Sequence, residues 1–118
     1  MNLLDIVAYA RQKLGTEPDY PWESHPECAV LRHASSRKWY ALVMTVAAER
    51  LGLSSSQQVA VLNVKVRPEH TGSLLLHRGI LPAYHMNKEH WVSVLLEGEV
   101  DDDMVISLLE ESYSLTST

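Results

Sequence analysis

The sequence predicts an α+β domain of two layers, in which a mainly antiparallel sheet carries N- and C-terminal helices and a short middle helix on one face. Three observations indicate this class. Apolar residues recur at helical spacing near both ends of the chain, and they alternate with a period of two in segments 38–48 and 59–66. The elements follow in the order helix, strands, short helix, strands, helix, which favours helices packed on an antiparallel sheet.

Residues 2–14 predict an amphipathic helix. Asn2 is a suitable N-cap and Gly15 a suitable stop. The apolar stripe of this helix consists of Leu3, Ile6, Val7, Ala10 and Leu14. Three prolines exclude regular structure from residues 16–27, and we expect Tyr20 and Trp22 to pin this loop to the core.

Segments 28–34 and 38–48 predict two strands joined by a turn at residues 35–37. In the second strand, alternation assigns Trp39, Ala41, Val43 and Thr45 to one face of the sheet and Tyr40, Leu42, Met44 and Val46 to the other. Both sets are apolar, so we expect this strand to be central.

Gly52 and the serines at 54–56 predict the next turn, and a third strand follows at residues 59–66. One face of this strand is wholly apolar and is expected to meet the core: Ala60, Leu62, Val64 and Val66. The other face becomes polar towards its end, so we expect Asn63 and Lys65 to lie on a wetter surface.

Pro68 predicts the start of a short helix that ends by Gly79. Residues 80–86 are expected to be extended, with an interruption at Pro82, and residues 87–89 to form a turn before a last strand at 90–96.

Gly98 breaks this strand, and Asp101–Asp103 open a C-terminal helix whose first turn suits the helix dipole. We find no internal repeat, so residues 1–118 are expected to form one domain. The sheet face opposite the helices is then either exposed to solvent or used to bind a partner.

The net charge of −5 argues at first against a nucleic-acid partner. The distribution is uneven, however: residues 28–96 hold eight of the ten Lys and Arg but three of the fifteen Asp and Glu, a local balance of +5. Either helix ends and loops collect acids by chance, or a basic middle face is framed by acidic termini.

Cys28 is the single cysteine, so no internal disulfide forms, which is typical of a reducing compartment. The N-terminus lacks a basic region ahead of an apolar run, and no segment approaches the ~20 apolar residues of a membrane span. We therefore expect a cytoplasmic protein without a membrane partner.

No catalytic constellation is evident. The six histidines form no H-E-x-x-H motif, the five glycines are scattered singly, and Cys28 lies in an apolar segment where an inert, buried thiol is expected. The acids at 101–103 are explained by the helix dipole. We predict no enzyme activity, no metal site and no cofactor.

Cations and aromatic residues instead gather around two turns. One group is Arg32, His33, Arg37, Lys38, Trp39 and Tyr40, and the other is Arg78, Tyr84, His85, Lys88, His90 and Trp91, while Lys65 and Arg67 end the third strand. Cations beside aromatic rings suit phosphate contact and base stacking. The alternative is that Trp39 and Trp91 fill the core and the cations only solubilise strand ends.

Several strings resemble the MmcQ/YjbR family over nearly the whole chain: Lys38–Val43, Leu62–Val66, Pro68-Glu69, Ser112-Tyr113 and above all Pro82–Val92. The resemblance implies a fold similar to CyaY, the frataxin homologue, and to secretion chaperones. It also implies a "double-wing" DNA-binding surface that includes Lys65, Tyr84, His85, Lys88, His90 and Trp91. The frataxin-like comparison suggests iron on an acidic first helix, but the acids here cluster at 101–103, so we expect no iron site.

We therefore expect a non-catalytic DNA-binding module that uses a sheet face and two hairpin wings. The expected contact residues are Arg32, Arg37, Lys38, Trp39, Lys65, Arg67, Arg78, Tyr84, His85, Lys88, His90 and Trp91. The alternative is a protein-interaction or secretion-chaperone-like module, whose open sheet face docks a peptide or a second copy of the chain.

Overall fold

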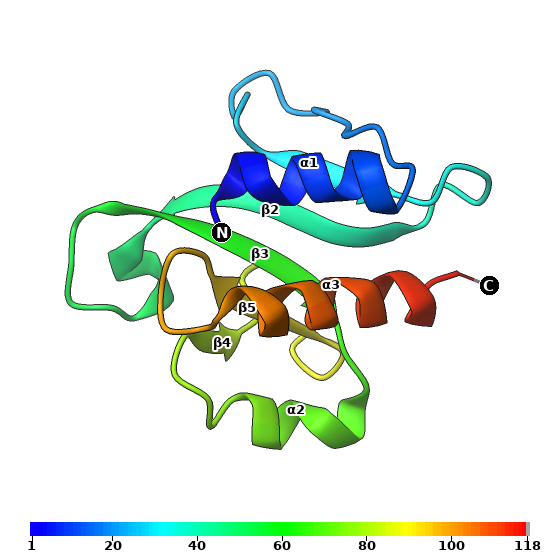
Figure 1. Ribbon diagram of the computed structural model, residues 1–118. Coiled ribbons are helices and arrows are strands. Elements are labelled where there is room, and N and C mark those ends of the chain that lie inside the picture. Colours follow the sequence, from blue (N-terminus) through cyan, green and yellow to red (C-terminus); the bar gives the residue numbers. More distant parts are fainter. Residues whose placement is uncertain (118) are drawn as a thin grey trace.

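The computed structural model describes residues 1–117 (Figure 1). Its helices are α1 (Leu3–Lys13), α2 (Pro68–Leu74) and α3 (Asp102–Leu115), with one 3-10 turn, η1 (Ala48–Leu51). Its strands are β1 (Ala29–Arg32), β2 (Trp39–Ala47), β3 (Gln58–Lys65), β4 (Ile80–Pro82) and β5 (Trp91–Leu95). Each predicted helix and strand is present, with bounds shifted by a few residues, whereas η1 was not predicted.

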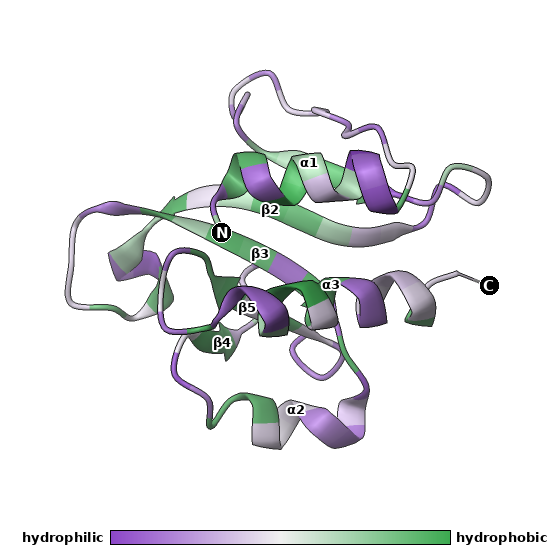
Figure 2. Ribbon diagram, viewed as in Figure 1, coloured by the Kyte–Doolittle hydropathy of each residue, from purple (hydrophilic) through white to green (hydrophobic). Residues whose placement is uncertain are grey.

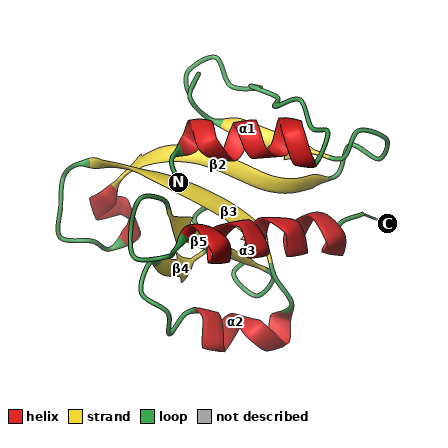
Figure 3. Ribbon diagram, in the orientation of Figure 1, coloured by secondary structure: helices red, strands yellow, loops and turns green. Residues whose placement is uncertain are grey.

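The strands form one antiparallel sheet in the order β1-β2-β3-β5-β4. The helices α1 and α3 lie side by side in front of this sheet in Figure 3. Leu74 at the end of the short α2, and Leu75 directly after it, pack against the same core. The predicted α+β architecture, with N- and C-terminal helices and a short middle helix, is therefore confirmed.

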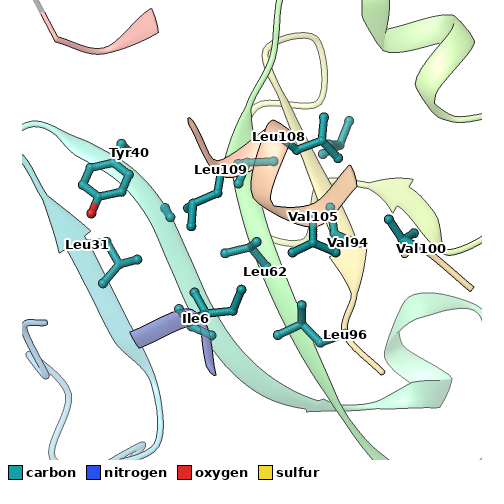
Figure 4. Close-up of a cluster of buried hydrophobic side chains, with 14 of the residues drawn as sticks. Ile6, Leu31, Tyr40, Leu62, Val94, Leu96, Val100, Val105, Leu108 and Leu109 are labelled. Carbon is teal, nitrogen blue, oxygen red and sulfur yellow. The ribbon is translucent and has the colours of Figure 1, made fainter. Parts of the chain in front are cut away.

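The main core lies between the sheet and the helices α1 and α3 (Figure 4). Ile6 from α1, Leu62 from β3 and Leu109 from α3 are completely buried there. Figure 2 shows that β2 and β3 are hydrophobic along most of their length, as central strands should be. The predicted core face of β3 is confirmed, since Leu62, Val64 and Val66 belong to this cluster.

A β-bulge at Tyr40 overturns the predicted facing of Trp39 and Tyr40. Leu31 of β1 pairs with Ala41, but Arg32 pairs with Trp39, so that Tyr40 is an extra residue in β2. Tyr40 and Ala41 consequently both face the helices, while Trp39 joins Leu42 on the open face of the sheet. Alternation alone cannot detect this shift, because it assumes a regular period of two.

Ser112 of α3 fills the gap that the bulge leaves between β2 and β3. Its hydroxyl oxygen accepts the Lys65 backbone N–H at 2.8 Å, and its O–H donates to the Tyr40 carbonyl at 2.5 Å. The side chain is fully buried. One α3 hydroxyl thus replaces the hydrogen bonds that the ladder loses at this end.

We expect Ser112→Ala to lower the free energy of unfolding by about 1–3 kcal/mol, because it leaves the Lys65 N–H and the Tyr40 carbonyl buried without partners. Urea unfolding measures this loss. The matched control is Ser114→Ala on the exposed side of the same helix, which should change stability by less than about 0.5 kcal/mol. Equal effects of the two substitutions would contradict the bridging role.

His33 closes the core beneath the turn between β1 and β2. It is 6% exposed, and its Nε2 lies 2.8 Å from the Thr116 hydroxyl. Its ring packs against Tyr113 and Tyr40 at centroid distances of 4.3 and 5.2 Å. Burial lowers the pKa of His33, and the charge of Lys38 acts in the same direction.

This lowered pKa predicts a pH-dependent stability. The unfolded chain takes up a proton at His33 near pH 6.5, before the folded chain does, so stability is complete above that pH and is lost as pH falls through the folded-state pKa. Urea unfolding from pH 7.5 to 5 should therefore show a steeper decline for the wild type than for His33→Gln. Identical slopes would contradict this assignment.

Candidate nucleic-acid interface

The antiparallel strand order brings the two predicted hairpin turns to the same end of the sheet. The first wing, residues 33–38, joins the end of β1 to the start of β2, and the second wing, residues 83–90, joins the end of β4 to the start of β5. The central strand β3 runs towards this end and finishes there at Lys65. We call this the wing end.

The first wing is a tight turn closed by backbone hydrogen bonds. The His33 N–H donates to the Lys38 carbonyl at 2.9 Å, and the Arg37 N–H donates to the His33 carbonyl at 3.0 Å. Arg37 adopts a φ of 64°, a left-handed conformation that costs a non-glycine residue energy. Arg37 and Lys38 are both exposed at this turn.

The second wing is built around Asn87. Its Oδ1 accepts the backbone N–H of Glu89 at 2.8 Å and of His90 at 3.2 Å, which fixes the turn and leaves Lys88 exposed at its tip. His85 has a φ of 59°, and its ring lies 4.0 Å from that of Tyr84. Both wings thus carry a strained, non-glycine residue from the predicted contact set.

Between the wings, four predicted contact residues share the open face of the sheet. Arg32 pairs with Trp39 across β1 and β2, and Lys65 pairs with Trp91 across β3 and β5. Directly paired residues point to the same side of an antiparallel sheet. All four are half-buried, so Trp39 and Trp91 are neither core residues nor fully exposed.

A buried polar ring fastens the second wing to the sheet and corrects the expectation of a wet Asn63. Asn63 is completely buried, and its Nδ2 donates to the Tyr84 carbonyl at 3.0 Å. The Tyr84 N–H donates to Ser93 Oγ at 2.9 Å, and the Ser93 hydroxyl donates to Asn63 Oδ1 at 2.5 Å. The wing covers Asn63, which sequence alternation cannot show.

Carboxylate partners lie beside Arg32, Arg67 and Arg78 of the predicted phosphate contacts. Arg32 lies 3.1 Å from Asp19 and also sits 5.4 Å from the centre of the Trp39 ring. The other two pairs are Arg67–Glu111 at 3.6 Å and Arg78–Glu99 at 3.7 Å. Because solvent-exposed ion pairs contribute only about 0–1 kcal/mol, such pairing reduces the availability of Arg67 and Arg78 without abolishing it. The Arg32–Asp19 pair is instead part-buried.

Two of these arginines lie away from the open face at the wing end. Arg78 precedes β4, whose first residue pairs near the far end of β5, so Arg78 lies at the opposite end of the sheet from Lys88. Arg67 points to Glu111 on α3, in the helix layer. The structure therefore gathers the remaining predicted residues at the wing end, whereas Arg67 lies in the helix layer and Arg78 at the opposite end of the sheet.

The open face also holds a pocket of about 610 Å³ between the loop 20–28 and the second wing. Trp22 and Trp39, whose rings meet edge to face at 6.1 Å, form one wall. Tyr20 is 50% exposed, so it does not pin this loop to the core as expected, whereas Trp22 is 38% exposed but contacts the half-buried Trp39. Sequence reasoning did not detect the pocket, because the loop and the wing are separated by some sixty residues.

Cys28 lines this pocket and is half-buried, not fully buried as expected. Burial raises the pKa of its thiol, which disfavours the nucleophilic thiolate. Among residues 1–117, no group of three or more His, Cys, Asp or Glu side chains is placed to hold a metal ion. Within the same range, no helix has the length and apolarity needed to cross a bilayer.

The family model described as YjbR matches residues 11–115 of this chain. Among relatives, the protein YyaQ of Bacillus subtilis is 46% identical over 112 residues, which cover 95% of both chains. The protein YjbR of Escherichia coli is 38% identical over 37 residues, or 31% of either chain. The resemblance to the MmcQ/YjbR family is thus confirmed at the level of the family, whereas the match to YjbR itself covers too little of either chain to equate the two proteins.

Solved structures agree with the fold. A crystal structure of a Pseudomonas syringae protein has 48% identity and a TM-score of 0.96, and the match covers 98% of this chain and 99% of that one. A Deinococcus radiodurans protein has 26% identity and a TM-score of 0.75, covering 99% of this chain and 79% of its own. YyaQ and YjbR are both described as uncharacterised, so the function is inferred from the chemistry of the site.

Proposed function

This chain belongs to the YjbR family, and we propose that it binds DNA, without catalysing a reaction, through the wing end of its sheet. The observation that carries the proposal is that both wings and the end of β3 lie at the same end of the sheet. Residues 37, 65 and 88 are far apart in the sequence, yet each lies at this end. Cations presented together on a rigid scaffold are what binding to a polyanion requires.

The spacing of the wings suits a DNA groove. In the strand order β1-β2-β3-β5-β4, the midpoints of the two hairpins are three strand spacings apart. At about 4.8 Å per spacing this is ~14 Å, comparable with the ~12 Å width of the major groove. Arg37 and Lys88 can then approach phosphates on opposite rims, with Lys65 between them.

The aromatic side chains shape this surface and make part of it less polar. Trp91 lies beside Lys65, and Trp39 lies beneath the guanidinium of Arg32. Flat rings beside cations provide stacking surfaces for sugars and bases. We assign to the interface Arg32, Arg37, Lys38, Trp39, Lys65, Tyr84, His85, Lys88, His90 and Trp91, and we leave out Arg67 and Arg78.

Binding is tested with a labelled 20-mer, offered both as a duplex and as a single strand at ~50 mM salt, where phosphate contacts are still strong. We expect retention that falls steeply as salt is raised. A protein that retains neither form at this salt concentration is not a DNA-binding module.

We expect Arg37→Gly to separate binding from stability. Glycine tolerates the φ of 64° at this position, so the variant should unfold at the same or higher urea concentration. Loss of one phosphate contact should lower DNA affinity about 10-fold at ~50 mM salt. The control is Glu97→Gly, which relieves a φ of 60° outside the wings and should not weaken binding. An unchanged affinity of the Arg37 variant would remove this wing from the interface.

The alternative of a protein-interaction module has less support from the edges of the sheet. The β1 edge is bridged by Asp19 through hydrogen bonds to Val30, and the β4 edge has three residues and ends in Pro82. Both features hinder the addition of a peptide strand. A dimer by light scattering, with a partner peptide but not DNA perturbing the open face, would favour this alternative.

A further inference from the structure

The pocket on the open face is not used by the phosphate contacts proposed above. Its lining includes Leu42 and Met44 of β2 and the aromatic residues Trp39 and Tyr84. Its volume of about 610 Å³ falls within the ~300–1,000 Å³ of small-ligand sites. The two wings contribute to its surroundings, because Trp39 follows the first wing directly and Tyr84 belongs to the second.

The charges of the pocket differ from those of the wing end. Its lining includes the carboxylates of Glu27 and Glu49 and the guanidinium of Arg50. With two acidic residues against one basic residue, this lining is less favourable for a phosphate than the exposed cations of the wings are. The pocket is therefore suited to a flat, uncharged ring that can stack on aromatic side chains and form hydrogen bonds.

A hollow of about 350 Å³ lies on the other side of Tyr84 and His85, which line both spaces, and it reaches Lys88. A chain whose phosphates contact Lys88 therefore passes next to the pocket mouth. In a duplex each base is paired and stacked, and it cannot enter a side pocket unless it leaves the helix. A single strand presents its bases freely to aromatic walls.

We propose that this pocket takes an unpaired base of single-stranded DNA, while the cations of the wings hold the flanking phosphates. This proposal rests on the proposed DNA binding and adds to it a preference for the single-stranded form. The base would stack against Trp39 or Tyr84, with hydrogen-bonding groups of His25, Glu27 and Gln58 near its edges.

The test compares three labelled 20-mers at the same salt concentration: a single strand, its duplex, and a single strand with abasic sites throughout. One stacked base should make the intact single strand bind about 10-fold or more tightly than the abasic strand, although both carry the same phosphates. The duplex, whose bases stay paired, should also bind less tightly than the intact single strand. Equal affinities for the intact and abasic strands would overturn the pocket assignment while leaving DNA binding in place, whereas no binding of any oligonucleotide would overturn both.

Val46→Trp provides a test from the side of the protein. Val46 is half-buried, lies on the open face of β2 and lines the pocket, and tryptophan is well tolerated in strands. The larger side chain should fill the pocket and abolish the preference for the intact strand over the abasic one. Trp22→Ala, at a 38% exposed wall residue, should reduce the same preference with little risk to folding. A preference unchanged in both variants would also overturn the assignment.

Discussion

Replacing Lys65 and Lys88 together by glutamine is expected to lower DNA affinity about 100-fold at ~50 mM salt. Each phosphate contact on duplex DNA contributes about −0.9 to the slope of log K against log salt concentration. Loss of two contacts should therefore make the slope shallower by about 1.8. Fluorescence anisotropy over a series of salt concentrations measures both quantities.

The matched control is the double variant Lys13→Gln with Arg78→Gln. It removes the same two positive charges, but Lys13 lies in the last turn of α1 and Arg78 at the far end of the sheet. If binding depended only on net charge, both double variants would weaken it equally. Such equality would contradict a defined interface at the wing end.

Asn63→Leu is expected to lower the free energy of unfolding by about 2–4 kcal/mol, the largest stability effect that we predict. Leucine approximates the size of asparagine but leaves the Tyr84 carbonyl and the Ser93 hydroxyl buried without their partner. The second wing should then detach from the sheet more readily. DNA affinity should fall with stability, since the position of Lys88 depends on this wing.

The control for this loss is Gln58→Leu, an amide-to-leucine change at an exposed site on the same strand, which should alter stability by less than about 0.5 kcal/mol. A double-mutant cycle with Ser93→Ala should give a coupling energy of 0.5 kcal/mol or more, as expected for residues in one network. Additive losses at Asn63 and Ser93 would show that the ring does not act as a unit.

The sequence predicted the elements well where local chemistry decides them. Asn2 and Asp5 form a capping box at the start of α1, and Asp101 accepts the Met104 N–H at the start of α3. These interactions join residues three positions apart, so they can be read directly from the chain. The alternation in β3 likewise predicted its core face.

The errors concern contacts between residues that are distant in the chain. The bulge at Tyr40 is accompanied by a hydrogen bond from Ser112 of α3, and the burial of Asn63 depends on a wing that begins twenty residues later. The ion pair of Arg32 with Asp19 likewise joins β1 to the preceding loop. Periodicity within one segment contains no information about these partners.

The position of the two wings likewise depends on the topology of the sheet, and not on the sequence of any single segment. Both wings were predicted as turns. They lie at the same end of the sheet because the antiparallel strand order places β3 and β5 between β2 and β4. The same order separates Arg78 from the second wing, although the two are close in sequence. The sequence thus predicted which residues the candidate site could contain. The strand order of the sheet determines which of them lie together.

The central claim is that cations from both wings and from β3 act as one DNA-binding surface. Titration of the isotope-labelled protein with a DNA 20-mer, followed by amide chemical shifts, tests this claim directly. We predict that the shifts move together at Arg37, Lys65 and Lys88, while those near Arg78 remain in place. Shifts confined to the helix layer or to the Arg78 end would contradict the claim.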